Sequence, residues 1–299
     1  MSGTAAAFLL LSAAPAIAPV PLDTPAIETE ETEVLEAGTD RDKRMTVPVE
    51  IGDNGPFDFV IDTGSQRTVI STTLAGQLSL EAGPSVNVVS IAGVDRVATV
   101  HVDQIKLGKR EFFGIRAPLF EADHIGAHGM VGTDSLQDQR VLIDFDKKRM
   151  EIGTKSSLGG NRGYEIVVTA RKLSGQLVLT RAVIDGVRVA VIIDTGAAWS
   201  IGNRALERAL ARRGNSAQVT LTSVTGHEVV ADIGFARTLK LREYDINNVL
   251  LAYTDSPAFA ELGLDDKPAL FLGMRELRLF KRVAIDFGRR RVLFDVPRT

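Results

Sequence analysis

The sequence predicts an all-β protein of two similar lobes, with short helices. Short segments of alternating apolar and polar residues, separated by turn residues, dominate the chain. Four landmarks of the first half also recur in the same order in the second half. The chain has 299 residues, 44% of them hydrophobic and 24% charged, which is typical of a globular protein with one large or two small domains.

The repeated landmarks indicate a duplication with loop insertions. The first pair is 132 positions apart and the last pair 142 positions apart, so the spacing drifts only slightly. The pairs are Asp62-Thr63-Gly64 with Asp194-Thr195-Gly196, Ser90-Ile91-Ala92-Gly93 with Ser223-Val224-Thr225-Gly226, Val131-Gly132 with Leu272-Gly273, and Ile143-Asp144-Phe145 with Ile285-Asp286-Phe287. We therefore expect lobes at 44–155 and 163–299, joined by a Gly/Ser-rich connector at 156–162.

The elements follow from local patterns, taken in chain order. In the first half, strands at 45–51 and 57–61 flank a turn, a short helix is expected at 72–78, and a hairpin at 88–100 turns near Gly93. In the second half, Asp185-Gly186 predicts a hairpin that leads into the strand 187–193. A helix is expected at 203–213, and a hairpin at 220–233 turns near Gly226.

Residues 1–43 have a different composition. The apolar run 5–18 resembles the core of a secretory signal, although no basic residue precedes Arg41, and residues 19–43 have the composition of an acidic linker. We expect export to the periplasm or beyond, with a membrane-anchored or cytoplasmic protein as the alternative.

The two aspartates that follow buried strands need a physical explanation. A desolvated carboxylate is costly without a partner, and one aspartate per lobe could provide that partner across a pseudo-twofold axis. Two carboxyls that share one proton titrate as a pair, one ionised and one neutral. Asp62 and Asp194 are therefore candidate catalytic residues for acid–base hydrolysis.

These motifs resemble the retropepsin-like and pepsin-like aspartic peptidases. The resemblance covers about residues 44 to 297 and includes the apolar-apolar-glycine segments 130–132 and 271–273. It implies a bilobal aspartic peptidase fold of the bacterial, single-chain, duplicated type. The implied activity is that of an endopeptidase whose water is activated between Asp62 and Asp194, with an extended peptide as substrate and no cofactor or metal.

The resemblance also assigns roles to the neighbours of the aspartates. Thr63 and Thr195 would grip across the lobes, and Gly64 and Gly196 would face the substrate. Two flaps would close over the cleft. Their implied substrate-binding residues are Ser90, Ile91, Ala92 and Gly93 in one lobe and Ser223, Val224, Thr225 and Gly226 in the other.

One asymmetry predicts how the pair shares its charge. Ser65 follows the first Asp-Thr-Gly segment, whereas Ala197 follows the second. A Ser65 hydroxyl bonded to the outer oxygen of Asp62 would favour its ionised form. We therefore expect Asp62 to carry the negative charge and Asp194 the proton.

Other classes of function are disfavoured. The absence of cysteine removes thiolate metal sites and a cysteine nucleophile, and a net charge of −3 without a large basic patch disfavours nucleic acid. His124, His128 and His227 are interpreted as loop histidines, and Trp199 as a packing residue. A peptide-binding pseudoprotease of the same fold is the alternative function. Two complete halves favour a monomer over a homodimer.

Overall fold

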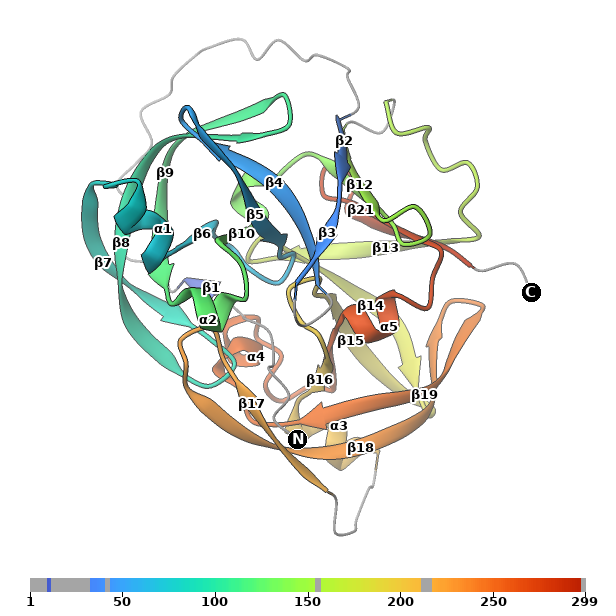
Figure 1. Cartoon of the computed structure of the whole chain (residues 1–299). Coiled ribbons are helices and arrows are strands. Elements are labelled where there is room, and N and C mark those ends of the chain that lie inside the picture. The colour runs from blue at the N-terminus through green and yellow to red at the C-terminus, as the bar shows by residue number, and fades with distance from the viewer. Residues whose placement is uncertain (1–9, 12–32, 41–43, 154–156, 211–216, 297–299) are drawn as a thin grey trace.

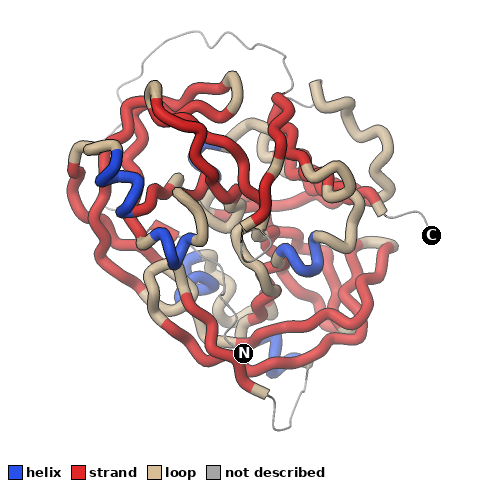
Figure 2. The backbone as a smooth tube through the Cα atoms, viewed as in Figure 1, coloured by secondary structure: helices blue, strands red, loops and turns tan. Residues whose placement is uncertain are grey.

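The computed structural model describes residues 10–11, 33–40, 44–153, 157–210 and 217–296. Strands make up most of this part of the chain, and the helices are short (Figure 2). The strands form one sheet of nine strands and one of thirteen. The predicted all-β, bilobal fold is therefore confirmed.

The first lobe runs from blue to green in Figure 1. Its sheet has the order β1-β7-β8-β9-β6-β10-β5-β4-β3. Three further strands of this lobe, β2, β11 and β12, belong to the second sheet. The elements of the first lobe are β1 (Leu10–Leu11), β2 (Glu33–Glu36), β3 (Gly38–Thr39), β4 (Met45–Ile51), β5 (Asn54–Ile61), β6 (Val69–Ser71), α1 (Thr72–Gln77), β7 (Ala82–Val89), β8 (Val94–Leu107), β9 (Arg110–Phe120), α2 (Ala122–Ile125), β10 (Gly129–Val131), a 3-10 turn (Thr133–Ser135), β11 (Arg140–Asp144) and β12 (Arg149–Gly153).

The second lobe repeats this order of elements. Its strands β17-β18-β19-β16-β20-β15-β14-β13 correspond one by one to β7-β8-β9-β6-β10-β5-β4-β3. Its elements are β13 (Ile166–Leu173), β14 (Gln176–Ile184), β15 (Val187–Ile193), β16 (Ser200–Gly202), α3 (Arg204–Ala209), β17 (Gln218–Thr222), β18 (Glu228–Leu241), β19 (Tyr244–Tyr253), α4 (Pro257–Glu261), β20 (Ala269–Leu272), α5 (Met274–Leu277), β21 (Arg282–Asp286) and β22 (Arg291–Asp295).

A shared sheet joins the two lobes. Its strands run in the order β2-β12-β11-β21-β22-β13, and the lobes meet where β11 pairs antiparallel with β21. Val141 and Ile143 on β11 and Val283 and Ile285 on β21 are fully buried, in a core that extends into both lobes. This continuous sheet and core hold one lobe against the other.

The predicted helices and turns occur where local patterns placed them. The side chain of Ser71 caps α1 by accepting from the Leu74 N–H, and Asn203 caps α3 in the same way. Asp185 and Gly186 both have positive φ angles in the tight turn between β14 and β15. The helix predicted at 203–213 is shorter than expected, since α3 ends at Ala209 and Leu210 forms its C-cap. Residues 211–213 lie outside the described part of the chain.

The segment before residue 44 departs from the expected linker. Within the described residues 33–40, β2 pairs with β12 and β3 pairs with β4, so this stretch belongs to the folded lobe. Apolar positions such as Leu35, which is buried against β12, explain why an acidic segment forms a strand here. Composition alone missed this pairing because the partner strand lies more than 100 residues away.

Two described residues fall within the signal-like segment. Leu10 and Leu11 form β1, which pairs with Val89 and Val88 of β7. The rest of that segment, with the expected cleavage site, lies outside the described residues. None of the helices in the described ranges has the length and apolar character needed to cross a membrane.

Candidate active site

Both Asp-Thr-Gly segments begin where a buried strand ends. Asp62 follows β5 and Asp194 follows β15. Their backbone N–H groups donate to the carbonyls of Val131 and Leu272, both at 3.0 Å, on the strands that run parallel to β5 and β15. The two apolar-apolar-glycine segments therefore lie directly behind the loops, as the sequence predicts.

The aspartate of each lobe lies against the glycine of the other lobe. A Cβ atom built on Gly64 would be 2.7 Å from the carboxyl carbon of Asp194, and one built on Gly196 would collide with the carboxyl group of Asp62. Both aspartates are 0% exposed. The fold thus brings together two carboxyl groups that are 132 positions apart in sequence. Only glycine leaves room for this approach.

The two threonines bind the loops to each other. The Thr63 hydroxyl donates to the Ile193 carbonyl (2.8 Å), and the Thr195 hydroxyl donates to the Ile61 carbonyl (2.7 Å). Each hydroxyl also accepts the backbone N–H of the opposite threonine, at 3.1 and 3.2 Å. These four buried bonds form the cross-lobe grip that the resemblance implies.

The inner oxygen (Oδ1) and the outer oxygen (Oδ2) of each carboxyl have different surroundings. Asp62 Oδ1 accepts the Gly64 N–H (2.8 Å), and Asp194 Oδ1 accepts the N–H groups of Gly196 and Ala197 (both 3.0 Å). The two Oδ2 atoms are buried and accept no hydrogen bond from another described residue, and the two carboxyls interact with each other through their side chains. Two desolvated acceptors left open in one place are the strongest local sign of a reactive site.

The pKa values of both carboxyls are raised, and charge contributes differently to each. Burial raises the pKa of Asp62 to about 7, although the Gly64 N–H and the charge of Arg44 act in the opposite direction. Burial, followed by the negative charge of Asp62, raises the pKa of Asp194 well above its ordinary value. The charge of Arg44 thus acts toward ionisation of Asp62, and the charge of Asp62 acts against ionisation of Asp194. That Asp62 carries the negative charge of the pair stays a prediction.

The predicted role of Ser65 is wrong. The Ser65 hydroxyl donates to the Arg67 carbonyl (2.7 Å) and accepts the Arg67 N–H, so it does not donate to Asp62. The tight turn after Gly64 directs the hydroxyl back onto its own loop. Instead, the pKa of Asp62 is lowered by the charge of Arg44, which belongs to the same lobe.

Both predicted flaps are hairpins whose tips bury an aliphatic side chain in the opposite lobe. Ile91, between β7 and β8, is 1% exposed and packs in a cluster with Ala197 and Phe271 of the second lobe. Val224, between β17 and β18, is 1% exposed and packs in a cluster with Val60 and other residues of the first lobe. Each tip therefore packs against the opposite lobe.

The remaining predicted flap residues shape the tips. Ser90 Oγ accepts the Ala92 N–H (3.2 Å), and Gly93 closes the first turn through its carbonyl. In the second tip the hydroxyls of Ser223 and Thr225 are 2.8 Å apart. These hydrogen bonds are internal to each hairpin and give the tips a defined shape.

Two histidines contribute to the second tip: His227 is part of its turn, and His124, which was expected in a loop, lies on α2 beside Gly226. His227 Nδ1 lies 3.3 Å from Asp95 Oδ1 on β8, which links the two flaps. A Cβ atom on Gly226 would collide with the His124 ring on α2. His128 has a separate partner, since its Nδ1 accepts the Asp58 N–H. Within the described ranges, no group of three or more potential ligand side chains could hold a metal ion.

Two hydroxyls behind the loops were missed at the sequence level. Thr68 accepts the Gly132 N–H (3.2 Å) and donates to Asp134 (2.8 Å). Ser200 accepts the Gly273 N–H (3.0 Å) and donates to buried Glu276. Thr68 and Ser200 both stand six positions after their aspartate, and that shared spacing is the signal that could have found them.

Trp199 has the packing role expected of it. The guanidinium of Arg275 lies over its ring, 5.4 Å from the ring centroid. Trp199 is partly buried and stands beside the second catalytic loop, where its carbonyl lies against Gly273.

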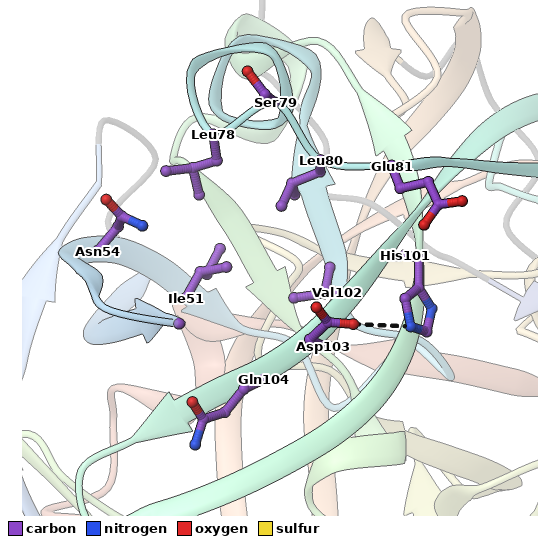
Figure 3. Close-up of a pocket in the computed structure, with 11 residues that line it drawn as sticks. Ile51, Asn54, Leu78, Ser79, Leu80, Glu81, His101, Val102, Asp103 and Gln104 are labelled. Carbon is purple, nitrogen blue, oxygen red and sulfur yellow. Dashed lines mark ion pairs between the residues drawn. The ribbon is translucent and has the colours of Figure 1, made fainter.

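A pocket of about 350 Å³ lies on the first lobe, between the β4–β5 turn, the end of α1 and β8. Figure 3 shows His101 and Asp103 paired across its edge, at 3.2 Å. None of its lining residues belongs to either catalytic loop or to either flap tip. It is therefore separate from the buried aspartate pair.

Comparison with known proteins agrees with this geometry. A family model described as an aspartyl protease matches residues 47–135 and 180–275, which together make up more than half of the chain. The two matches fall on the two lobes, and each contains one Asp-Thr-Gly loop and one flap hairpin. A search of curated proteins found no match.

Proposed function

This chain belongs to the aspartyl protease family, and on that premise we propose that it is an active aspartic endopeptidase in which Asp62 and Asp194 share the catalytic work. The observation that carries the proposal is the buried carboxyl pair, whose two outer oxygens accept no hydrogen bond from another described residue. A water molecule held by these oxygens would complete the site.

The different contributions of charge to the two pKa values give each carboxyl a role. Ionised Asp62 takes a proton from the water while the water oxygen attacks the scissile carbonyl carbon. Asp194, protonated, donates to the carbonyl oxygen and so stabilises the tetrahedral intermediate. When the intermediate breaks down, a proton passes to the leaving amide nitrogen and the carboxyl pair again holds a single proton.

The substrate in this proposal is an extended peptide. Such a peptide can bind to flap hairpins in the manner of an added β-strand. Because Ile91 and Val224 are buried in opposite lobes, the flaps must separate before a peptide can bind. One chain supplies both aspartates, so the proposed catalytic unit is a monomer. Because residues 5–18 resemble a secretory signal, we also propose that the enzyme is exported and cleaves exported proteins.

The test is cleavage of a peptide library by the purified full-length chain, followed by mass spectrometry. Asp62→Asn and Asp194→Asn should each lower kcat by about 10³-fold or more, because an amide at residue 62 cannot accept the proton of the water and an amide at residue 194 cannot hold and supply the proton of the pair. Pepstatin, a peptide analogue of the transition state, should inhibit the wild-type protein.

The control is Asp103→Asn, which changes a carboxyl whose side chain is 96% exposed on the far side of the lobe. It should cleave the library as the wild type does. Binding of library peptides without any cleavage by the wild type would identify a peptide-binding pseudoprotease instead. Cleavage that persists in both aspartate variants would refute the proposed roles.

A further inference from the structure

The two catalytic loops are each held by a side chain from the opposite lobe. Arg44 stands at the start of β4 and Gln176 at the start of β14, two strands that occupy equivalent places in the lobes. Each residue lies 18 positions before the catalytic aspartate of its own lobe. The duplication therefore places an arginine and a glutamine at matching positions.

Both side chains cross the boundary between the lobes and make the same contact. Arg44 Nη1 donates to the Gly196 carbonyl (3.3 Å), and Gln176 Nε2 donates to the Gly64 carbonyl. Arg44 is 1% exposed and Gln176 is 0% exposed, so both contacts are shielded from solvent. Each loop thus has one backbone carbonyl fixed by the other lobe.

The two contacts differ in charge. Arg44 carries a buried guanidinium that Asp40 holds from one side, with Nε 2.7 Å and Nη2 2.5 Å from Asp40 Oδ2. Its Nη2 also donates to the Ile125 carbonyl on α2. Gln176 is neutral, and its Oε1 has no hydrogen-bond partner among the described residues. Of these two equivalent residues, only Arg44 carries a charge.

We propose that Arg44 and Gln176 are positioning residues that hold the two catalytic loops in register, and that the charge of Arg44 makes the loops unequal and places the negative charge of the pair on Asp62. Arg44 is paired with Asp40, and Asp40 also interacts with the charge of Arg278. Arg44 donates to the carbonyl of Gly196, the glycine that lies against the carboxyl group of Asp62, so its guanidinium contacts the residue that packs on Asp62. The activity measurements below rest on the proposed endopeptidase function.

The central test is the double variant Asp40→Asn/Arg44→Gln, which gives both lobes a glutamine and leaves no unpaired buried aspartate at residue 40. Without the guanidinium, Asp62 should ionise at higher pH. A lone opposite charge nearby shifts a carboxyl by about one pH unit or more. Because the variant also removes the opposing charge of Asp40, we expect the acid limb of the kcat/KM profile to move up by less than about one pH unit. Gln176→Met, which removes a contact but no charge, should lower kcat without moving the limb.

A readout independent of turnover separates this proposal from the proposed function. The aspartate carboxyls can be titrated by carbon-13 NMR in the wild type and in the double variant. The pKa of Asp62 should be higher in the double variant, whether or not peptides are cleaved. If the double variant does not fold, Arg44→Lys provides the test. It keeps the charge but loses the planar fork, so the acid limb should stay in place while kcat falls.

An unchanged carboxyl titration and acid limb in Asp40→Asn/Arg44→Gln would overturn the charge assignment. An acid limb that moves in Gln176→Met as much as in the double variant would do the same, because that variant changes no charge. If the wild type cleaves no peptide while the NMR titration moves as expected, the proposed function fails and the present inference stands.

Discussion

At the scale of single residues, hydrogen bonds between the two threonines and the backbone of the opposite lobe stabilise the site. Each of Thr63 and Thr195 donates one bond and accepts another across the lobes, in a place without solvent. A hydroxyl in this position is irreplaceable by an apolar group of the same shape, because its two partners are buried backbone groups.

Thr63→Val should therefore destabilise the protein by about 2–4 kcal/mol, since it leaves the Ile193 carbonyl and the Thr195 N–H without a partner. Thr63→Ser, which keeps the hydroxyl, should cost about 1 kcal/mol or less. Denaturant unfolding measures both changes. Equal stability of the two variants would show that the grip contributes nothing.

The buried aspartates also make stability depend on pH. The pKa of Asp62 is 3.8 in an unperturbed chain and about 7 in the fold, so the folded protein binds this proton more tightly. The stability that the fold gains by binding this proton more tightly is fully present below pH 4 and is lost as the pH rises through 7. Asp62→Asn removes the titrating group and hence this loss.

We expect the unfolding free energy of Asp62→Asn, relative to that of the wild type, to increase by about 2–4 kcal/mol between pH 4 and pH 8. Denaturant midpoints across this range measure the difference. Parallel curves for the two proteins would mean that Asp62 is not desolvated in solution.

At the scale of elements, the two flap hairpins are copies with different tips. Gly226 has a φ of +82° and lies against the His124 ring, whereas a Cβ on Gly93 would have no atom within 4 Å. The two glycines therefore carry different constraints, although they hold equivalent places in the repeat. The second tip is fitted to the first lobe, and the first tip has open space at its glycine.

Gly226→Ala should cost about 1–2 kcal/mol, through the positive φ and the collision with His124, and should raise KM several-fold by displacing the flap. Gly93→Ala is the matched control and should be close to the wild type in both respects. Thermal unfolding and peptide kinetics provide the measurements. His124→Ala combined with Gly226→Ala should recover the part of the loss that is due to the collision.

At the scale of the whole molecule, the shared sheet determines how the lobes meet. Arg140 on β11 pairs with Asp286 on β21 across the boundary, at 2.6 Å and with both side chains almost fully buried. Its Nη1 also donates to the Gly160 carbonyl in the connector. One arginine thus joins the first lobe, the connector and the second lobe.

Arg140→Met should destabilise the protein by about 3–5 kcal/mol, because it leaves the Asp286 carboxylate buried without its cation. The comparison is Lys240→Met, which breaks an exposed pair with Asp245 and should cost less than about 1 kcal/mol. Denaturant unfolding distinguishes the two. A small effect of Arg140→Met would show that the lobes are held by apolar packing alone.

Much of the fold and the centre of the site could be predicted, because the duplication repeats local signals. The strands before Asp62 and Asp194, the flap turns and the short helices all follow from patterns within a few residues. Residues 33–36 were misassigned to the linker because their strand partner, β12, lies more than 100 residues away. Residues 38–39 were misassigned because so short a strand, paired with nearby β4, has no alternating pattern of its own. The Ser65 hydroxyl was misassigned because its bond depends on the detailed turn of the loop.

The sequence by itself determined that the protein has two equivalent lobes and that each supplies one aspartate, since repeated local patterns specify repeated local structure. Only the tertiary structure decided how the lobes differ at the point where they meet. Arg44 and Gln176 act on the opposite lobe's loop, and the flap tips are buried in the opposite lobe. Such contacts depend on the packing of segments more than 100 residues apart, which no local pattern encodes.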